Sequence, residues 1–336
     1  MEALQPWLPT SEMKEASVEI LRSNWSAGIR AGECPGLQPA GMDAGAPGVA
    51  EKSWAAVFAD LVKARLTMLV LLTTLVGFYV GWRGPMDFAL MFNTLAATAL
   101  VAAGAAALNQ LLEREYDAKM RRTQNRPLPA GRLQPNTVML FGGVCAMTGL
   151  VYLALAVNLL TCVIGAVTLI SYLFIYTPLK RVTWLNTAVG AVPGALPPLM
   201  GWTAARGELS GEGWALFAIL AFWQIPHFMA IAWMYRDEYA RAGFKMLPVI
   251  DPDGLRTGQQ TVSHTLALLL VSLCPFAFNM AGSVYLAGAL VLGAGFLWCA
   301  IQFSRQLTLA RARQLFLASI LYLPLLLTVM VLDKVK

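Results

Sequence analysis

The sequence has few charged residues for its length. Lysine, arginine, aspartate and glutamate make up 13% of the 336 residues, whereas they make up about 25% of a typical soluble domain. Hydrophobic residues account for 57%, and they gather in runs long enough to cross a bilayer. This composition excludes a disordered chain, and a net charge of +6 within it does not indicate a nucleic-acid-binding module. It predicts an integral membrane protein.

Cysteine and histidine are also scarce. The five cysteines lack paired spacing, and four of them lie inside apolar runs, where a free thiol packs as a small hydrophobic group. They are Cys34, Cys145, Cys162, Cys274 and Cys299. The sequence has two histidines, His227 and His264. A secreted disulfide scaffold is therefore excluded, and nothing indicates a zinc or redox centre.

Residues 1–52 lack a sustained apolar run. They are mixed in charge and rich in glycine, proline and alanine, so we expect a disordered tail before a membrane domain over residues 53–336. The first apolar run begins at Leu66, and nothing before it has the pattern of a signal peptide. The tail also lacks the Arg- and Ser-rich, acid-poor composition of a transit peptide, which favours a bacterial cytoplasmic (inner) membrane over a mitochondrial one.

Nine apolar runs follow the tail. Each approaches or exceeds the roughly 17–25 residues that a helix needs to cross the hydrocarbon core. The runs are 66–82, 86–108, 138–157, 158–176, 183–202, 213–234, 262–280, 284–303 and 314–332. They are continuous and do not alternate with polar residues, so they predict an all-α bundle of about nine transmembrane helices and not a barrel.

The basic residues between the runs predict the orientation of the bundle. The connections after the second, fourth, sixth and eighth runs carry 15 of the 17 loop lysines and arginines, and the opposite connections carry Arg83 and Arg206. Because positive charge is retained on the cytoplasmic side, we expect a cytoplasmic N-terminus and an external C-terminus.

A column of oxygen-bearing side chains ends the second run. Asn109, Glu113 and Asp117 recur every four residues, so they lie along one face if the helix continues through Asp117. Such ligands suit Mg²⁺, which binds through one or two carboxylates and keeps its other positions for water and substrate phosphates. Basic residues that suit phosphate oxygens follow at once: Lys119, Arg121, Arg122 and Arg126. The pattern predicts a diphosphate site; the alternative is a solvated loop with ordinary ion pairs and topology-setting charge.

A second polar segment ends the sixth run. Asp237 and Glu238 stand there beside Arg236 and Arg241. Two acidic loops on one face of a membrane can clamp one diphosphate through two or three metal ions, so we expect this segment to bind metal as well.

Trp223, Gln224 and His227 lie just before this segment, inside the sixth run. A lone membrane histidine either binds a ligand or only bonds a neighbouring helix. Both interpretations stay open for His227, whereas packing is favoured for His264.

A third segment joins Lys180 and Arg181 to a proline-rich run with Pro193, Pro197 and Pro198. Proline removes helical hydrogen bonds, so the run predicts either a broken helix that lines a cavity or a packing kink. The two cations either bind substrate on the face of the acidic loops or only set topology.

Together these segments resemble a known family. The column of Asn109, Glu113 and Asp117 is similar to the N-x-x-x-[DE]-x-x-x-D motif of the UbiA-type intramembrane prenyltransferases. Four further stretches are similar to the branch that farnesylates haem: YTPLKR (176–181), GAVPGALPPLMGW (190–202), WQIPHF (223–228) and EYARAGFKMLPV (238–249). The resemblance covers roughly residues 55–332. Many members of the superfamily have two well-spaced aspartates in the second loop, whereas this chain has Asp237, Glu238 and Tyr239.

The resemblance implies a nine-helix bundle with a central cavity capped by two cytoplasmic loops. It implies transfer of farnesyl from farnesyl diphosphate to the ring A vinyl group of haem b, with addition of water, and Mg²⁺ as cofactor. The implied metal ligands are Asn109, Glu113, Asp117, Asp237 and Glu238. The implied diphosphate ligands are Lys119, Arg122, Arg126, Lys180 and Arg181. His227 is the implied haem contact, with Trp223 and Gln224 beside it. Handover of the product to a haem A synthase or a terminal oxidase would fit this activity, but no residue of the sequence indicates it.

Three other functions compete. A related prenyltransferase with another acceptor, such as a quinone precursor or a chlorin, would share the metal and diphosphate residues and differ around WQIPHF and MLPV. A transporter predicts charges near the bilayer midplane, whereas nearly every charge here lies at a helix end. A purely structural membrane subunit gives no reason for an acid column beside a basic cluster.

Overall fold

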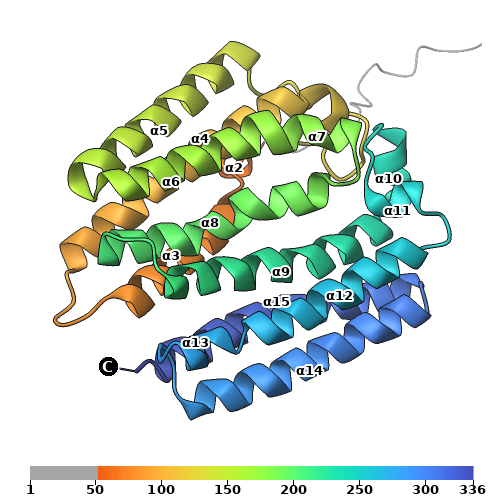
Figure 1. Ribbon diagram of the computed structural model, residues 1–336. Coiled ribbons are helices and arrows are strands. Elements are labelled where there is room, and N and C mark those ends of the chain that lie inside the picture. Colours follow the sequence, from red (N-terminus) through yellow and green to blue (C-terminus); the bar gives the residue numbers. More distant parts are fainter. Residues whose placement is uncertain (1–51, 336) are drawn as a thin grey trace, which may run out of the picture. The chain divides into compact units, whose positions relative to one another are not determined.

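The computed structural model describes residues 52–335, and the elements of this part of the chain are helices (Figure 1). Eight helical segments are long and apolar enough to cross a membrane. They are α3 (Ala64–Gly81), α4 (Phe88–Asp117), α5 (Pro135–Ala156), α6–η1–α7 (Leu159–Ile170, Ser171–Tyr176, Thr177–Val182), α9 (Gly211–Met234), α12–α13 (Leu255–Val271, Cys274–Ala277), α14 (Ser283–Arg305) and α15 (Leu309–Leu332). The remaining helices are α2 (Trp54–Leu61), α8 (Asn186–Arg206), α10 (Arg236–Arg241) and α11 (Leu247–Ile250). The tail predicted over residues 1–52 lies, apart from Lys52, outside the described residues.

The outer helices expose apolar side chains. On α5, for example, Leu155 is 84% exposed, and Leu140 and Met147 are also exposed. Such a surface is stable in lipid and costly in water. The chain is therefore a multi-pass membrane protein, and the expected all-helical bundle is confirmed.

The long helix α8 lies inside the bundle. It packs against α3, α6 and α9, and 15 of its 21 residues are buried. It is not among the segments that are long and apolar enough to cross a membrane, which fits a helix that is surrounded mainly by protein. With α8 the described part of the chain has nine long helical segments, close to the nine predicted runs.

The prolines of α8 do not break it. The helix is continuous from Asn186 to Arg206 through Pro193, Pro197 and Pro198, so the broken helix, one of the two predicted alternatives, is wrong. The helix packs very closely against α3. A Cβ on Gly201 of α8 would lie 1.9 Å from the Thr74 carbonyl oxygen, and one on Gly77 would lie 2.0 Å from the Pro198 carbonyl oxygen. The backbones of α3 and α8 therefore approach each other so closely that only glycine fits at these two positions.

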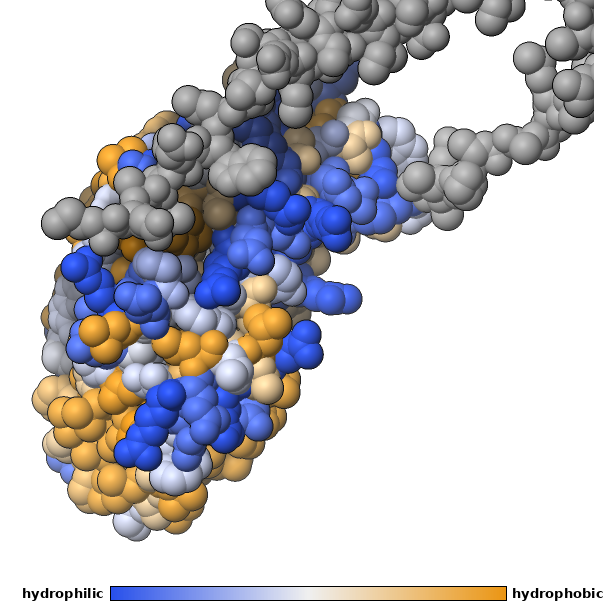
Figure 2. All heavy atoms as spheres, turned by 90° about the vertical axis from the view of Figure 1, so that its right-hand side faces the viewer, coloured by the Kyte–Doolittle hydropathy of each residue, from blue (hydrophilic) through white to orange (hydrophobic). Residues whose placement is uncertain are grey.

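One end of the bundle, which we call the polar end, carries the loop after α4 together with α7, α10 and α11 (Figure 1). The C-terminus lies at the opposite end. Figure 2 looks onto the polar end and shows that hydrophilic side chains gather there, beside apolar ones. As expected from the column of oxygens, α4 continues through Asp117 before it ends.

Candidate active site

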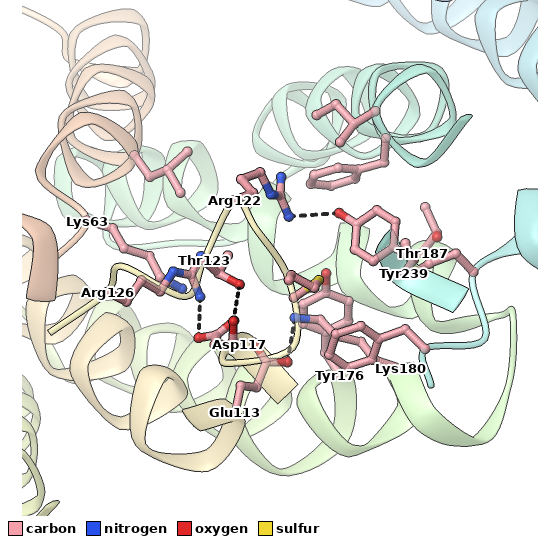
Figure 3. Close-up of a pocket in the computed structure, with 16 residues that line it drawn as sticks. Lys63, Glu113, Asp117, Arg122, Thr123, Arg126, Tyr176, Lys180, Thr187 and Tyr239 are labelled. Atoms are coloured by element: carbon pink, nitrogen blue, oxygen red, sulfur yellow. Dashed lines mark hydrogen bonds and ion pairs between the residues drawn. The ribbon is translucent and has the colours of Figure 1, made fainter. Parts of the chain in front are cut away.

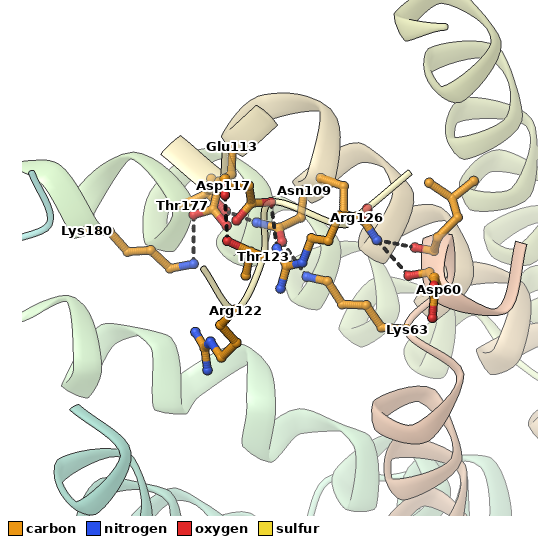
Figure 4. A network of polar contacts seen from close by, with 12 residues as sticks. Asp60, Lys63, Asn109, Glu113, Asp117, Arg122, Thr123, Arg126, Thr177 and Lys180 are labelled. Atoms are coloured by element: carbon orange, nitrogen blue, oxygen red, sulfur yellow. Dashed lines mark hydrogen bonds and ion pairs between the residues drawn. The ribbon is translucent and has the colours of Figure 1, made fainter. Parts of the chain in front are cut away.

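The last turns of α4 carry the predicted column of oxygen ligands. Asn109, Glu113 and Asp117 are 0%, 4% and 1% exposed, and Figure 4 shows them along one side of the helix. Buried carboxylates of this kind are stable only when they are paired or hydrogen-bonded. Their partners therefore define the site.

Each member of the column has a cationic partner from a different part of the chain. Lys63 Nζ donates to Asn109 Oδ1 at 2.6 Å, Lys180 Nζ to Glu113 Oε1 at 2.7 Å, and Arg126 Nη1 to Asp117 Oδ2 at 2.6 Å. The column therefore lies between three positive groups (Figures 3 and 4). Such groups also bind phosphate oxygens.

Hydroxyl groups hold the two ends of the column in place. Thr177 Oγ1 accepts a hydrogen bond from Asn109 Nδ2 at 3.0 Å, which turns the Asn109 oxygen toward Lys63. Thr123 Oγ1 donates to the Asp117 carbonyl oxygen at 2.8 Å and so closes the end of α4.

Lys63 is a site residue that the sequence did not reveal. It lies between α2 and α3 in the left-handed backbone region, with φ 49°, which is unfavourable for a side chain of this size. Gln110 holds this junction, since its Nε2 donates to the carbonyl oxygens of Asp60 and Leu61 at 2.8 Å each. Lys63 stands three residues before the start of the first apolar run, where a cation is also expected from topology alone.

The pKa of Lys63 is lowered to about 7, first by burial and then by the positive charge of Arg126, although Glu113 and Asp117 partly offset this. An anion bound beside Lys63 would favour its protonated form. The ammonium is therefore suited to a negatively charged ligand.

The three positive groups surround a polar cavity of about 180 Å³ (Figure 3). Glu113 and Asp117 line it together with Lys63, Arg126 and Lys180. A second, apolar cavity of about 310 Å³ adjoins it. The two share Lys63, Leu66, Tyr176, Lys180 and Phe228 as lining residues. A charged group and an apolar chain of one molecule thus fit side by side.

Of the predicted diphosphate residues, Arg122, Arg126 and Lys180 line the polar cavity. Lys119 and Arg181 do not. Both contact Tyr116 instead. The Lys119 ammonium lies 5.4 Å from the centre of the Tyr116 ring, and the Arg181 guanidinium lies 4.3 Å from it. Arg181 also donates a hydrogen bond to the Tyr116 hydroxyl. Their role in binding diphosphate stays a prediction.

The second acidic segment is placed differently from the first. The Asp237 side chain is 92% exposed and its nearest ionic partner is Arg236. Glu238 Oε2 accepts a hydrogen bond from the Arg122 backbone at 3.4 Å. Neither carboxylate lines the two cavities, whereas Tyr239 lines the polar one. Metal binding by Asp237 and Glu238 therefore stays a prediction that these positions do not support.

Arg122 connects the two loops across the polar cavity. Its Nη2 donates to the Tyr239 hydroxyl at 3.0 Å, and its guanidinium lies 5.3 and 5.6 Å from the ring centres of Tyr235 and Tyr239. Figure 3 shows this contact beside the carboxylates. The second loop thus reaches the site through tyrosine rings that pack against the Arg122 guanidinium.

The residues predicted to contact haem separate onto two faces of α9. Gln224 lines the apolar cavity, and its Nε2 donates to the Ala191 carbonyl oxygen at 3.2 Å. His227 and Trp223 point toward α15 instead. His227 Nδ1 lies 2.7 Å from Ser319 Oγ, and Trp223 Nε1 donates to the Ser319 carbonyl oxygen at 2.8 Å. A haem contact of His227 stays a prediction.

The donor set of the column fits a divalent cation. Two buried carboxylates line one cavity, with an amide oxygen one turn away. Residues 52–335 contain no group of three or more His, Cys, Asp or Glu side chains that could hold a metal ion by themselves. Mg²⁺ suits such a partial set, because water and phosphate oxygens complete its octahedron.

These features define a class of protein. The chain belongs to the UbiA prenyltransferase family, whose sequence profile matches residues 70–323. It is therefore an intramembrane prenyltransferase.

Individual relatives sharpen the comparison. The chain is 48% identical to a protoheme IX farnesyltransferase of Solibacter usitatus over 82% of its own length and 98% of the relative's. It is 44% identical to a protoheme IX farnesyltransferase of Koribacter versatilis over 86% and 96% of the two chains.

Solved structures show the same fold. A digeranylgeranylglyceryl phosphate synthase has a TM-score of 0.72 at 14% identity, over 84% of this chain and 99% of that one. A UbiA homologue of Archaeoglobus fulgidus bound to GPP and Mg²⁺ has a TM-score of 0.58 at 16% identity, over 82% and 99%. The expected fold and family are confirmed.

Proposed function

We propose that this prenyltransferase transfers a farnesyl group from farnesyl diphosphate to the ring A vinyl group of haem b, with Mg²⁺ as cofactor, and forms haem O. The observation that carries the proposal is the junction of the two cavities, where buried carboxylates and cations meet an apolar space. The names of its relatives support the choice of farnesyl and haem. Delivery of the product to a haem A synthase or a terminal oxidase belongs to the same proposal.

The polar cavity is suited to ionising an allylic diphosphate. Lys63, Lys180 and Arg126 lie beside the carboxylates, and Arg122 faces them from the loop. Their donors stabilise the negative charge that grows on the departing diphosphate. Glu113, Asp117 and Asn109 would hold Mg²⁺, which would supply Lewis-acid stabilisation of the same charge.

The apolar cavity receives the prenyl chain and protects the allylic cation. Tyr176 and Phe228 line both cavities at their junction, and aromatic faces attract cations. The bond between the allylic carbon and oxygen breaks, and the vinyl group then supplies the electron pair for the new carbon–carbon bond. Water adds to the resulting cation and loses a proton. Excluding water from the first cation prevents simple hydrolysis.

The direct test uses purified membranes that contain the full chain, with haem b, farnesyl diphosphate and Mg²⁺. We expect haem O to form and to be lost when Mg²⁺ is chelated, as measured by pigment chromatography. A homologous enzyme assayed in parallel is the positive control. If haem b is recovered unchanged while a quinone precursor or a chlorin is prenylated, the acceptor assignment is wrong.

We further propose that the polar end faces the cytoplasm of a bacterial cell, because it carries most of the loop cations. A reporter that is active only outside the cytoplasm, such as alkaline phosphatase, is expected to be active when fused after Lys336 and inactive when fused after Asn125. A cytoplasmic fluorescent reporter is expected to give the opposite result. The reverse pattern at both positions would contradict this orientation.

A further inference from the structure

The apolar cavity has a definite depth. Its lining residues run along α4 from Ala106 to Thr98, and along α8 from Gly190 to Met200. At about 1.5 Å per residue, Gly190 and Met200 are about 15 Å apart along α8, and Glu113 in the polar cavity and Thr98 are about 22 Å apart along α4. An extended chain of three isoprene units is also about 15 Å long, from carbon–carbon bonds of about 1.5 Å.

The upper walls of this cavity are made of small side chains. On α8 the lining residues Gly190, Pro193, Gly194 and Pro197 recur at helical spacing. On α4 the corresponding lining residues are alanines 102, 105 and 106. These small side chains leave room for a prenyl chain and do not limit its length.

The cavity ends where larger side chains begin. Met200 is the first long side chain on the lining face of α8 and its last lining residue; on α4 the branched Val101 follows the alanines, and the buried Thr98 is the last lining residue. Met200 and Val101 also belong to a buried apolar cluster with Leu153, Ile164 and Leu199. The Met200 side chain reaches α6, since its Cε lies 3.3 Å from where a Cβ on Gly165 would be. Met200 and Val101, together with Thr98, thus form the floor of the cavity, and packed protein lies behind Met200 and Val101.

We propose that Met200, supported by Val101, determines the longest prenyl chain that the enzyme accepts. The inference rests on the proposed prenyl transfer, but not on the identity of the acceptor. A fourth isoprene unit would have to occupy the space of the Met200 side chain. A shorter chain leaves part of the apolar cavity unfilled and so gains less from burial.

The test measures chain-length preference in variants of the full chain. Competition between farnesyl and geranylgeranyl thiodiphosphates, which are not cleaved readily, gives the binding preference without any acceptor. In Met200→Ala we expect the preference for the longer chain to rise about 10-fold or more, because a single methylene group in an apolar pocket changes discrimination by about 10–200-fold. Ala105→Phe fills the middle of the cavity and is expected to shift the preference toward geranyl thiodiphosphate.

Met229→Ala is the matched control. Met229 is about as buried as Met200 but lines neither cavity. The Met229→Ala variant therefore loses a similar side chain from the core without changing the floor of the apolar cavity. An unchanged preference in folded Met200→Ala would overturn the proposal; if that variant does not fold, an unchanged preference in Ala105→Phe overturns it. An altered chain preference without formation of haem O would support the role of Met200 in chain length and would reject only haem b as the acceptor.

Discussion

Replacing Asp117 by alanine is expected to reduce kcat for prenyl transfer by about 10³-fold, the upper range for loss of one electrostatic contact in a transition state. Asp117 is buried in the polar cavity and binds Arg126 at 2.6 Å. Its loss removes a proposed Mg²⁺ ligand and frees the arginine. The fold is expected to survive, because the Arg126 side chain is 26% exposed and can be hydrated. The measurement is the single-turnover rate in detergent, with gel filtration to verify folding.

Glu115→Ala is the control for that variant. Glu115 lies two residues earlier on α4, but its side chain is 75% exposed and pairs with the neighbouring Arg114. We expect nearly unchanged turnover, since exposed ion pairs contribute little. Asp237→Ala should cost far less than Asp117→Ala, because the Asp237 side chain is exposed outside both cavities. Near-normal turnover of Asp117→Ala would remove the metal role of the column.

Replacing Lys63 by methionine is expected to weaken binding of farnesyl thiodiphosphate by about 30-fold, which corresponds to about 2 kcal/mol, the lower range for loss of one partner in a buried charged contact. Methionine retains most of the length of the lysine chain but removes the cation that contacts Asn109. The affected quantity is the Kd of the diphosphate compound, measured by titration calorimetry of the detergent-solubilised protein.

Arg65→Met is matched to the Lys63 variant. Arg65 lies two residues later in the chain, is exposed, and lines neither cavity. The Arg65→Met substitution also removes one positive charge from the same segment. Equal weakening in both variants would show that Lys63 acts only through general surface charge and would reject a direct contact with the diphosphate.

The local part of the site was predictable from the sequence. A spacing of four residues places Asn109, Glu113 and Asp117 on one helix face whatever surrounds that helix, and the structure has this arrangement. The apolar runs likewise predicted the bundle, because bilayer thickness sets the length of each span. The run 262–280 was less accurate: it corresponds to α12 followed by the separate turn α13, with Pro275 at the start of that turn.

Contacts between distant parts of the chain were not predictable. Lys63 and Asn109 are 46 positions apart, and Lys180 and Glu113 are 67 apart, so no spacing rule relates them. The position of the second acidic loop was not predictable for the same reason, since it depends on contacts between distant parts of the chain. Metal binding by Asp237 and Glu238 was expected from their chemistry and stays a prediction; on the short helix α10 the Asp237 side chain lies in solvent, whereas Tyr239 lines the polar cavity. The direction of a side chain on a six-residue helix depends on packing that the sequence alone does not show.

The buried position of α8 has a consequence for how the protein enters the membrane. Among the long helices of residues 52–335, α8 is the one whose composition falls short of a membrane span. A helix with glycine, asparagine, threonine and three prolines partitions poorly from a translocon into lipid on its own. Its neighbours α3 and α6 are synthesised earlier, and α9 comes directly after it. Membrane insertion of α8 is therefore expected to depend on helices that are already in place, so a truncated chain lacking α3 should leave α8 uninserted.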